Sequence, residues 1–147
     1  MSVDLAVPLR SAIVANSAIT AKLTAYGGSF PVFTRRPLPA DVPKLVIIVS
    51  PDIAQSNTDG LSDQRPVFTR DISIYGKNDS PQDYRDVEML AYLIHDLFHR
   101  KRNAISVVGW GVSFITAVGP IVAPTDDDNF VGRLVTLNIQ LGKLGAA

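Results

Sequence analysis

The sequence contains no cysteine, which excludes disulfide bonds, thiolate zinc sites and cysteine nucleophiles. It has only two histidines and one glutamate, Glu88, so nitrogen and sulfur ligands for a metal site are few, although an aspartate could supply an oxygen ligand. Lys plus Arg and Asp plus Glu each number 14, and the chain lacks the positive excess of nucleic-acid-binding domains. No stretch reaches the ~20 apolar residues of a membrane-spanning helix. The first ten residues lack a basic region ahead of an apolar run, so we expect no signal peptide and no membrane partner.

The remaining composition predicts one domain, 1–147, whose 46% hydrophobic residues can supply a core without a metal or other staple. A helix is predicted to open the chain around Leu5 to Ile13, with Pro8 in its first turn. Asn16 is a candidate cap for a second, kinked piece that ends before the glycine pair at 27 and 28.

The next hundred residues alternate between strand and turn signals. Four prolines between 31 and 43 leave room only for a short edge strand at 32–34, and the β-branched run 45–49 predicts a core strand. Period-two alternation predicts a half-buried strand from 68 to 76. Between these two strands, residues 50–66 contain only three apolar residues apart from two prolines, and they predict a long polar loop at the tip of a hairpin.

A second helix is predicted from Ser80, because a capping Ser, Pro81 and an acid at the third helical position form a strong start signal. The helix is predicted to run to about Arg100, with an apolar stripe formed by Val87, Leu90, Ala91, Ile94, Leu97 and Phe98. Residues 104–118 resemble one bent or two short strands broken at Gly109-Trp110-Gly111, and a polar loop at 120–129 precedes a closing strand at 133–141. The order predicts an α+β domain with an antiparallel or mixed β-sheet and two α-helices packed on one face.

The search for chemistry centres on His95 and His99, which share a helix face at i and i+4 and imitate the H-E-x-x-H zinc motif with Asp96 in place of Glu. A metal site needs a third ligand that neither histidine nor cysteine can supply, so we predict no functional metal, no cofactor and no catalytic residue. A metal-dependent hydrolase using this pair remains an alternative. The acidic run 126–128 lacks the EF-hand spacing and is interpreted as a solvated loop of open role.

Two basic clusters, Arg35-Arg36 and Arg100-Lys101-Arg102, could contact phosphates. Both are short and lack interleaved aromatic residues, and the second cluster suits a helix C-terminus. A small nucleic-acid-binding domain is therefore kept only as a second alternative.

Two features point to partners. Met89 and Leu93 lie off the main stripe of the second helix, and they fit either the peripheral core or a subunit interface. The residues predicted for a subunit interface are Arg35, Arg36, Met89, Leu93 and Trp110. The polar segment 50–66 is predicted to dock a partner through Asp52, Ile53, Asn57, Asp59, Leu61, Asp63 and Arg65.

The layout resembles the tail completion family of long-tailed phages, also called tail terminator or head-to-tail joining proteins. The pieces that carry the resemblance are the opening helix with Asn16-Ser17-Ala18-Ile19, the proline-rich approach to Lys44-Leu45-Val46-Ile47-Ile48, the Asp59-Gly60-Leu61 segment, Arg70-Asp71-Ile72-Ser73-Ile74-Tyr75-Gly76, the helix from Ser80 to Arg100, and the closing Arg133-Leu134-Val135-Thr136-Leu137-Asn138-Ile139.

The resemblance implies a non-enzymatic virion assembly protein at the tail–head junction, assembled in the host cytoplasm. It implies a homo-oligomeric, hexameric ring that caps the tail tube and meets a head-side connector or neck protein, with DNA passing through the lumen without sequence-specific binding. The family has no catalytic motif, so the resemblance assigns no site residues.

Overall fold

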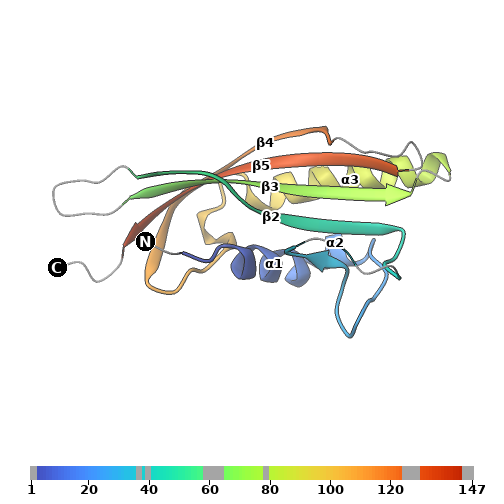
Figure 1. Cartoon of the computed structure of the whole chain (residues 1–147), viewed down its shortest axis with the longest axis horizontal. Coiled ribbons are helices and arrows are strands. Elements are labelled where there is room, and N and C mark those ends of the chain that lie inside the picture. Colours follow the sequence, from blue (N-terminus) through green and yellow to red (C-terminus); the bar gives the residue numbers. More distant parts are fainter. Residues whose placement is uncertain are drawn as a thin grey trace.

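Five strands form one mixed sheet that runs along the length of the molecule (Figure 1). The structure, a computed structural model, describes residues 3–35, 38, 41–57, 65–77, 80–123 and 130–143, and for 51–57 only the backbone is considered. In spatial order the strands are β1 (Val32–Phe33), β2 (Leu45–Asn57), β3 (Pro66–Lys77), β5 (Phe130–Lys143) and β4 (Trp110–Val122). β1 is parallel to β2, and the other neighbours are antiparallel.

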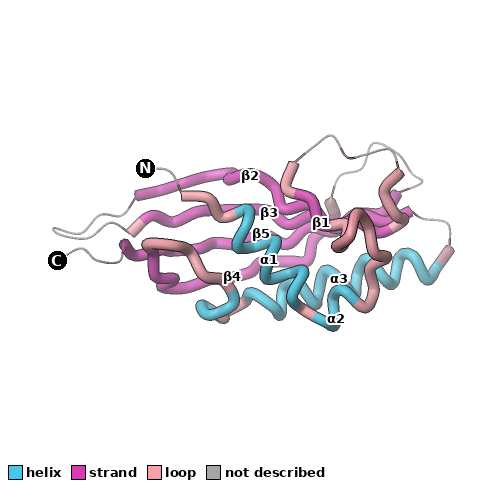
Figure 2. Tube along the Cα trace, turned by 90° about the horizontal axis from the view of Figure 1, so that it is seen from below, coloured by secondary structure: helices cyan, strands magenta, loops and turns pink. Residues whose placement is uncertain are grey.

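The helices α1 (Ala6–Ala15), α2 (Ser17–Thr20) and α3 (Pro81–Phe98) pack on one face of this sheet (Figure 2). A 3₁₀ turn, η1 (Arg102–Ala104), follows α3. The Asn16 side chain accepts a hydrogen bond from the Ile19 N–H at 3.1 Å, so it caps α2 and separates it from α1. The predicted α+β class and the predicted kink are confirmed, with α2 forming a short third helix.

The start of α3 is fixed by the predicted capping box. The Ser80 hydroxyl accepts from the Asp83 N–H, and the Asp83 carboxylate accepts from the Ser80 N–H. Lys44, the residue before β2, adds an ion pair to Asp83 at 3.1 Å. The predicted apolar stripe is buried except for the partly buried Leu97; its buried members are Val87, Leu90, Ala91, Ile94 and Phe98.

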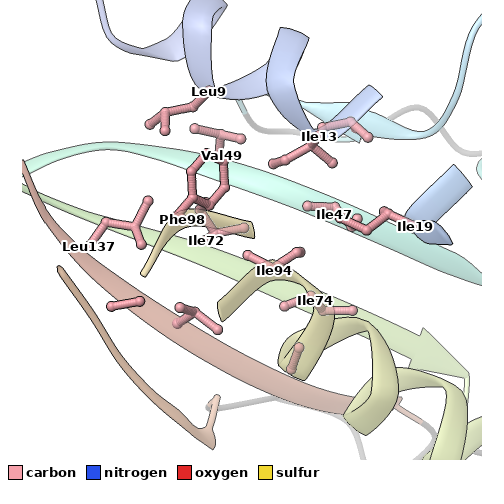
Figure 3. Packing of buried hydrophobic residues seen from close by; sticks show 14 of the residues in the cluster. Leu9, Ile13, Ile19, Ile47, Val49, Ile72, Ile74, Ile94, Phe98 and Leu137 are labelled. Atoms are coloured by element: carbon pink, nitrogen blue, oxygen red, sulfur yellow. The ribbon is translucent and has the colours of Figure 1, made fainter. Parts of the chain in front are cut away.

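The core lies between the helices and the inner face of the sheet (Figure 3). Alternate residues of β2 and β3, including Ile47 and Ile72, are fully buried against Leu9 of α1 and Phe98 of α3. Gly76 lets α3 approach β3 closely, because a Cβ at that position would lie 2.6 Å from Cγ2 of Val87. The period-two pattern therefore sets which side of each strand the helices cover.

The outer face of the sheet carries polar cross-strand pairs. Thr69 donates to the Asn138 side chain at 2.9 Å, and Thr136 donates to the Asp71 carboxylate at 2.7 Å. These pairs link β3 to β5 on the face away from the helices and fix the register of the two strands.

The prediction that residues 50–66 form a structureless loop is wrong for 50–57. β2 continues to Asn57, which pairs with Pro66 at the start of β3, although register shifts interrupt the ladder between Val49 and Ala54. Backbone pairing overrides the polar composition, because strand formation depends on neighbouring strands more than on local propensity. Asp52 and Ile53 therefore lie in a strand and not in a loop.

The predicted break near Trp110 also has a different form. Residues 102–104 are a 3₁₀ turn, Gly109 adopts a φ of 82°, and a single long strand begins at Trp110. Pro120, predicted to lie in a loop, is inside β4 at a register shift between Val118 and Ile121. An edge strand tolerates this proline because its missing N–H can face away from the ladder.

Candidate functional site

The two histidines stack at the C-terminal end of α3, with ring centroids 4.8 Å apart. The His99 Nδ1 accepts a hydrogen bond from the Ala117 N–H at 3.0 Å, and the His95 Nδ1 lies 3.1 Å from the Asp96 carboxylate. Among the described residues no group of three His, Cys, Asp or Glu side chains is placed to hold a metal ion. This geometry gives His99 a structural task, which is to tie the end of α3 to the edge of β4.

The backbone next to His99 extends this contact. The Arg100 N–H donates to the Ile115 carbonyl at 2.8 Å, with Arg100 at a φ of 59°. Residues 99 and 100 therefore cover β4 from Ile115 to Ala117, where an edge strand would otherwise expose unpaired backbone groups.

A buried arginine anchors the N-terminal half of α3 to β5. Arg133, 8% exposed, donates to the Tyr84 hydroxyl and to the Glu88 carboxylate, the latter at 3.3 Å. Its guanidinium also stacks on the Tyr84 ring, 4.8 Å from the centroid. Glu88 remains 43% exposed, so the sole glutamate of the chain faces both this arginine and solvent.

The hairpin of β2 and β3 extends beyond α1 at one end of the molecule (Figure 1). At its base Arg70, 6% exposed, donates from Nη1 to the Ser50 carbonyl at 2.9 Å. Of the predicted partner-binding residues, Asp52, Ile53 and Asn57 lie on β2, and Arg65 is exposed just before β3. Asp59, Leu61 and Asp63 lie outside the described residues, as do 126–128.

The residues predicted for a subunit interface do not form one patch. Met89 is 51% exposed on α3, whereas Leu93 is partly buried and packs against the core. Trp110 lines a groove of about 660 Å³ between α1 and residues 104–108, and Arg35 lines a separate depression beside β1. Arg36 lies outside the described residues. The structure thus keeps Met89 and Leu93 one turn apart on α3 and places Trp110 and Arg35 in two separate hollows.

The depression beside β1 has a volume of about 320 Å³ and combines two cations with aromatic rings. Arg10 and Arg35 line it together with Tyr26 and Phe33, whose rings meet edge to face at 5.8 Å. Tyr26 donates a hydrogen bond to Asp41 at 2.9 Å, and this bond, with smaller contributions from desolvation and the Asp41 charge, raises the pKa of Tyr26. Arginines beside aromatic rings are typical of protein interfaces.

Exposed apolar side chains identify a surface that the sequence prediction missed. Within the part of the chain that the structure describes, large exposed hydrophobic residues lie on α3 (Tyr84, Met89, Tyr92), beside the groove (Val7, Val108), and along β4 and the start of β5 (Phe114, Val118, Ile121, Val122, Phe130). The last group is the largest. Its signal in the sequence is the absence of any charged residue from 104 to 123, which is unusual for an edge strand.

No helix among the described residues is long and apolar enough to span a membrane. No family model matches the sequence, and no curated protein matches it. Among solved structures, this chain is similar to a chain of the structure described as "Virion of native gene transfer agent (GTA) particle". The TM-score is 0.74 and the sequence identity is 9%. The match covers 94% of this chain and 94% of that chain. At this identity the likeness establishes the fold alone.

Proposed function

We propose that this chain is a non-enzymatic structural protein of a phage-like virion, and that its copies form a ring that caps the end of the tail tube and joins it to the head. The observation that carries the proposal is the likeness over nearly the whole of both chains to a component of a gene transfer agent particle. The tail-end position and the hexameric ring come from the family resemblance of the sequence.

Two features of the described residues support a role in assembly. The hairpin of β2 and β3 projects past α1 with polar residues, which suits a docking element on a rigid support (Figure 1). Phe114, Val118 and Ile121 are exposed on the outer face of β4, which favours contacts with other proteins there.

The histidine pair gives less support to a hydrolase. His99 uses its Nδ1 to accept the Ala117 N–H, so only its Nε2 is available as a metal ligand. The Arg100-Lys101-Arg102 cluster lies in the turn and 3₁₀ segment after α3, and the Arg100 backbone pairs with β4. No contact among the described residues favours the metal-dependent hydrolase or the nucleic-acid-binding domain over a role in assembly.

The test replaces residues 57–63 with a short Gly-Ser linker and asks whether tails still join filled heads. Shortening a surface loop changes closure entropy by only about 0.6 kcal/mol per halving of length, so the variant should fold normally. We expect separate heads and tails by electron microscopy when tails lacking the protein are complemented with the variant in vitro. The matched control changes an exposed residue far from the hairpin, Tyr92→Ser on α3, and should restore joining.

Joining by tails that never receive the protein would contradict the proposed function itself. Normal joining with the linker variant would contradict only the docking role of the hairpin.

A further inference from the structure

Arg10 is a partly buried arginine on α1 whose guanidinium is fixed at one end only. Its Nε donates to the Val32 carbonyl of β1 at 2.8 Å, which uses one of the five N–H groups of the side chain. The groups on Nη1 and Nη2 make no hydrogen bond or ion pair with a described residue, and no described side-chain nitrogen is both buried and without a partner. Arg10 therefore offers an oriented pair of donors to the depression beside β1, which it lines.

The same depression contains a second cation and two aromatic rings. Arg35 is exposed and forms no ion pair with a described residue. The rings of Tyr26 and Phe33 meet edge to face at 5.8 Å. The volume of about 320 Å³ lies at the lower end of the range of about 300–1,000 Å³ that is typical of ligand pockets. A hollow of this size suits one side chain of a partner.

The sequence around the depression supplies no carboxylate to the two arginines. Residues 36–40 are Arg, Pro, Leu, Pro and Ala. The acid that follows, Asp41, accepts a hydrogen bond from the Tyr26 hydroxyl at 2.9 Å and forms no ion pair with a described residue. Two positive charges against this one negative charge leave the depression with a positive excess, which attracts an anion.

Another arginine of the chain shows which group completes such an arrangement. Arg133 stacks on the Tyr84 ring and pairs with the Glu88 carboxylate at 3.3 Å. Arg10 shares its depression with aromatic rings, but no carboxylate of the described residues contacts it. A planar guanidinium matches a carboxylate through two parallel hydrogen bonds. The comparison points to a carboxylate from outside the chain.

Nucleic acid is a poorer match for this pair of arginines. Binding to nucleic acid depends on many phosphate contacts along a basic surface, whereas the positive and negative side chains of this protein balance at 14 each. The other basic cluster, 100–102, follows α3 where that helix contacts β4, and β4 and β1 are opposite edges of the sheet. The cations therefore do not form one continuous track.

We propose that the depression beside β1 binds an aspartate or glutamate side chain of another protein. Arg10 donates from Nη1 and Nη2 to the carboxylate, Arg35 adds a second positive charge, and apolar neighbours of the bound residue pack on Tyr26 and Phe33. The bond to the Val32 carbonyl orients Arg10 before the partner arrives, which lowers the entropy lost on binding. The site belongs to a single copy and goes beyond the proposed function, because it requires neither the ring nor the tail.

The test titrates the full chain with a capped acidic tripeptide, N-acetyl-Leu-Glu-Leu-amide, and follows it by nitrogen-15 NMR. The matched peptide has Gln in place of Glu, which keeps the shape and removes the charge. We expect saturable shifts of the Arg10 Nε–H and of the backbone amides of 26–29 and 33–35. The Glu peptide should bind about tenfold more tightly than the Gln peptide, because hydrogen bonds to a charged group are stronger than neutral ones.

Two variants of the protein locate the binding. Arg10→Gln should abolish saturable binding, but Arg10 also ties α1 to β1. Arg35→Gln therefore separates binding from folding, because Arg35 is exposed; it should weaken the Glu peptide several-fold and leave Tm unchanged. The matched control, Arg102→Gln in the exposed 3₁₀ turn, should bind the peptide like the unmodified chain.

Three results would overturn the proposal. The first is equal binding of the Glu and Gln peptides, or no shift at the named residues. The second is unchanged binding of the Glu peptide by both Arg10→Gln and Arg35→Gln. The third is a short oligothymidylate that shifts the same residues, binds more tightly than the Glu peptide and loses binding in Arg10→Gln, which would assign the site to phosphate. None of these results depends on head–tail joining, so failure of this site is distinguishable from failure of the proposed function.

Discussion

The close approach of α3 to β3 predicts that Gly76→Ala destabilises the fold only while Val87 is present. Gly76 does not have a positive φ, so alanine is conformationally allowed, and the reduced freedom of the unfolded chain would by itself stabilise by about 0.4–1 kcal/mol. The new Cβ, however, would lie 2.6 Å from Val87 Cγ2 and 3.3 Å from Leu45 Cδ1. Overpacking of this kind costs about 1–3 kcal/mol.

The stiffness of Val87 makes the clash hard to relieve. A β-branched side chain in a helix has one strongly preferred rotamer, so α3 itself must move. We expect a net loss of about 1–2 kcal/mol in the free energy of unfolding. This corresponds to about 2–4 °C in Tm for each kcal/mol in a chain of this size.

A double-mutant cycle measured by urea unfolding tests the reasoning. In the Val87→Ala background the clashing methyl is gone, and Gly76→Ala should stabilise by about 0.4–1 kcal/mol. The sign of the effect should therefore reverse between the two backgrounds. An effect of the same sign and size in both would refute the proposed contact between Gly76 and Val87.

Three further predictions concern single side chains. Ser80→Ala should lower the free energy of unfolding by about 1 kcal/mol in thermal melts, because α3 loses its capping hydroxyl. Ser80→Asp should keep most of the capping stability, because its carboxylate can accept the same N–H. Protein purified without chelators should contain well under one zinc per chain by elemental analysis, and one ion per chain that disappears in His99→Ala would contradict this. The pKa of Tyr26 should lie above about 10, the pKa of free tyrosine. The hydrogen bond from Tyr26 to Asp41 should therefore stabilise the fold at pH values below about 10, and this stabilisation should be lost as the pH rises through the raised pKa. Asp41→Ala should lower that pKa in an ultraviolet titration that uses Tyr26→Phe as the blank, and an unchanged titration would contradict the assigned cause.

Local signals determined much of the fold. The capping box at Ser80, the apolar stripe of α3 and the alternation in β3 and β5 each depend on residues close in sequence, and each is present in the structure. The cap at Asn16 belongs to the same class. These features follow from the sequence because helix caps and side-chain periodicity are set by neighbours a few residues apart.

Long-range pairing decided the rest. The polar residues 50–57 are extended because β3 lies beside them. The His99 side chain accepts the Ala117 N–H because α3 ends against β4. Arg10 lines one depression together with Arg35 only because α1 packs beside β1. The sequence by itself determined which residues prefer helix, strand and core. Only the tertiary structure decided which edges and side chains remain exposed for a partner, since exposure depends on contacts between residues far apart in the chain.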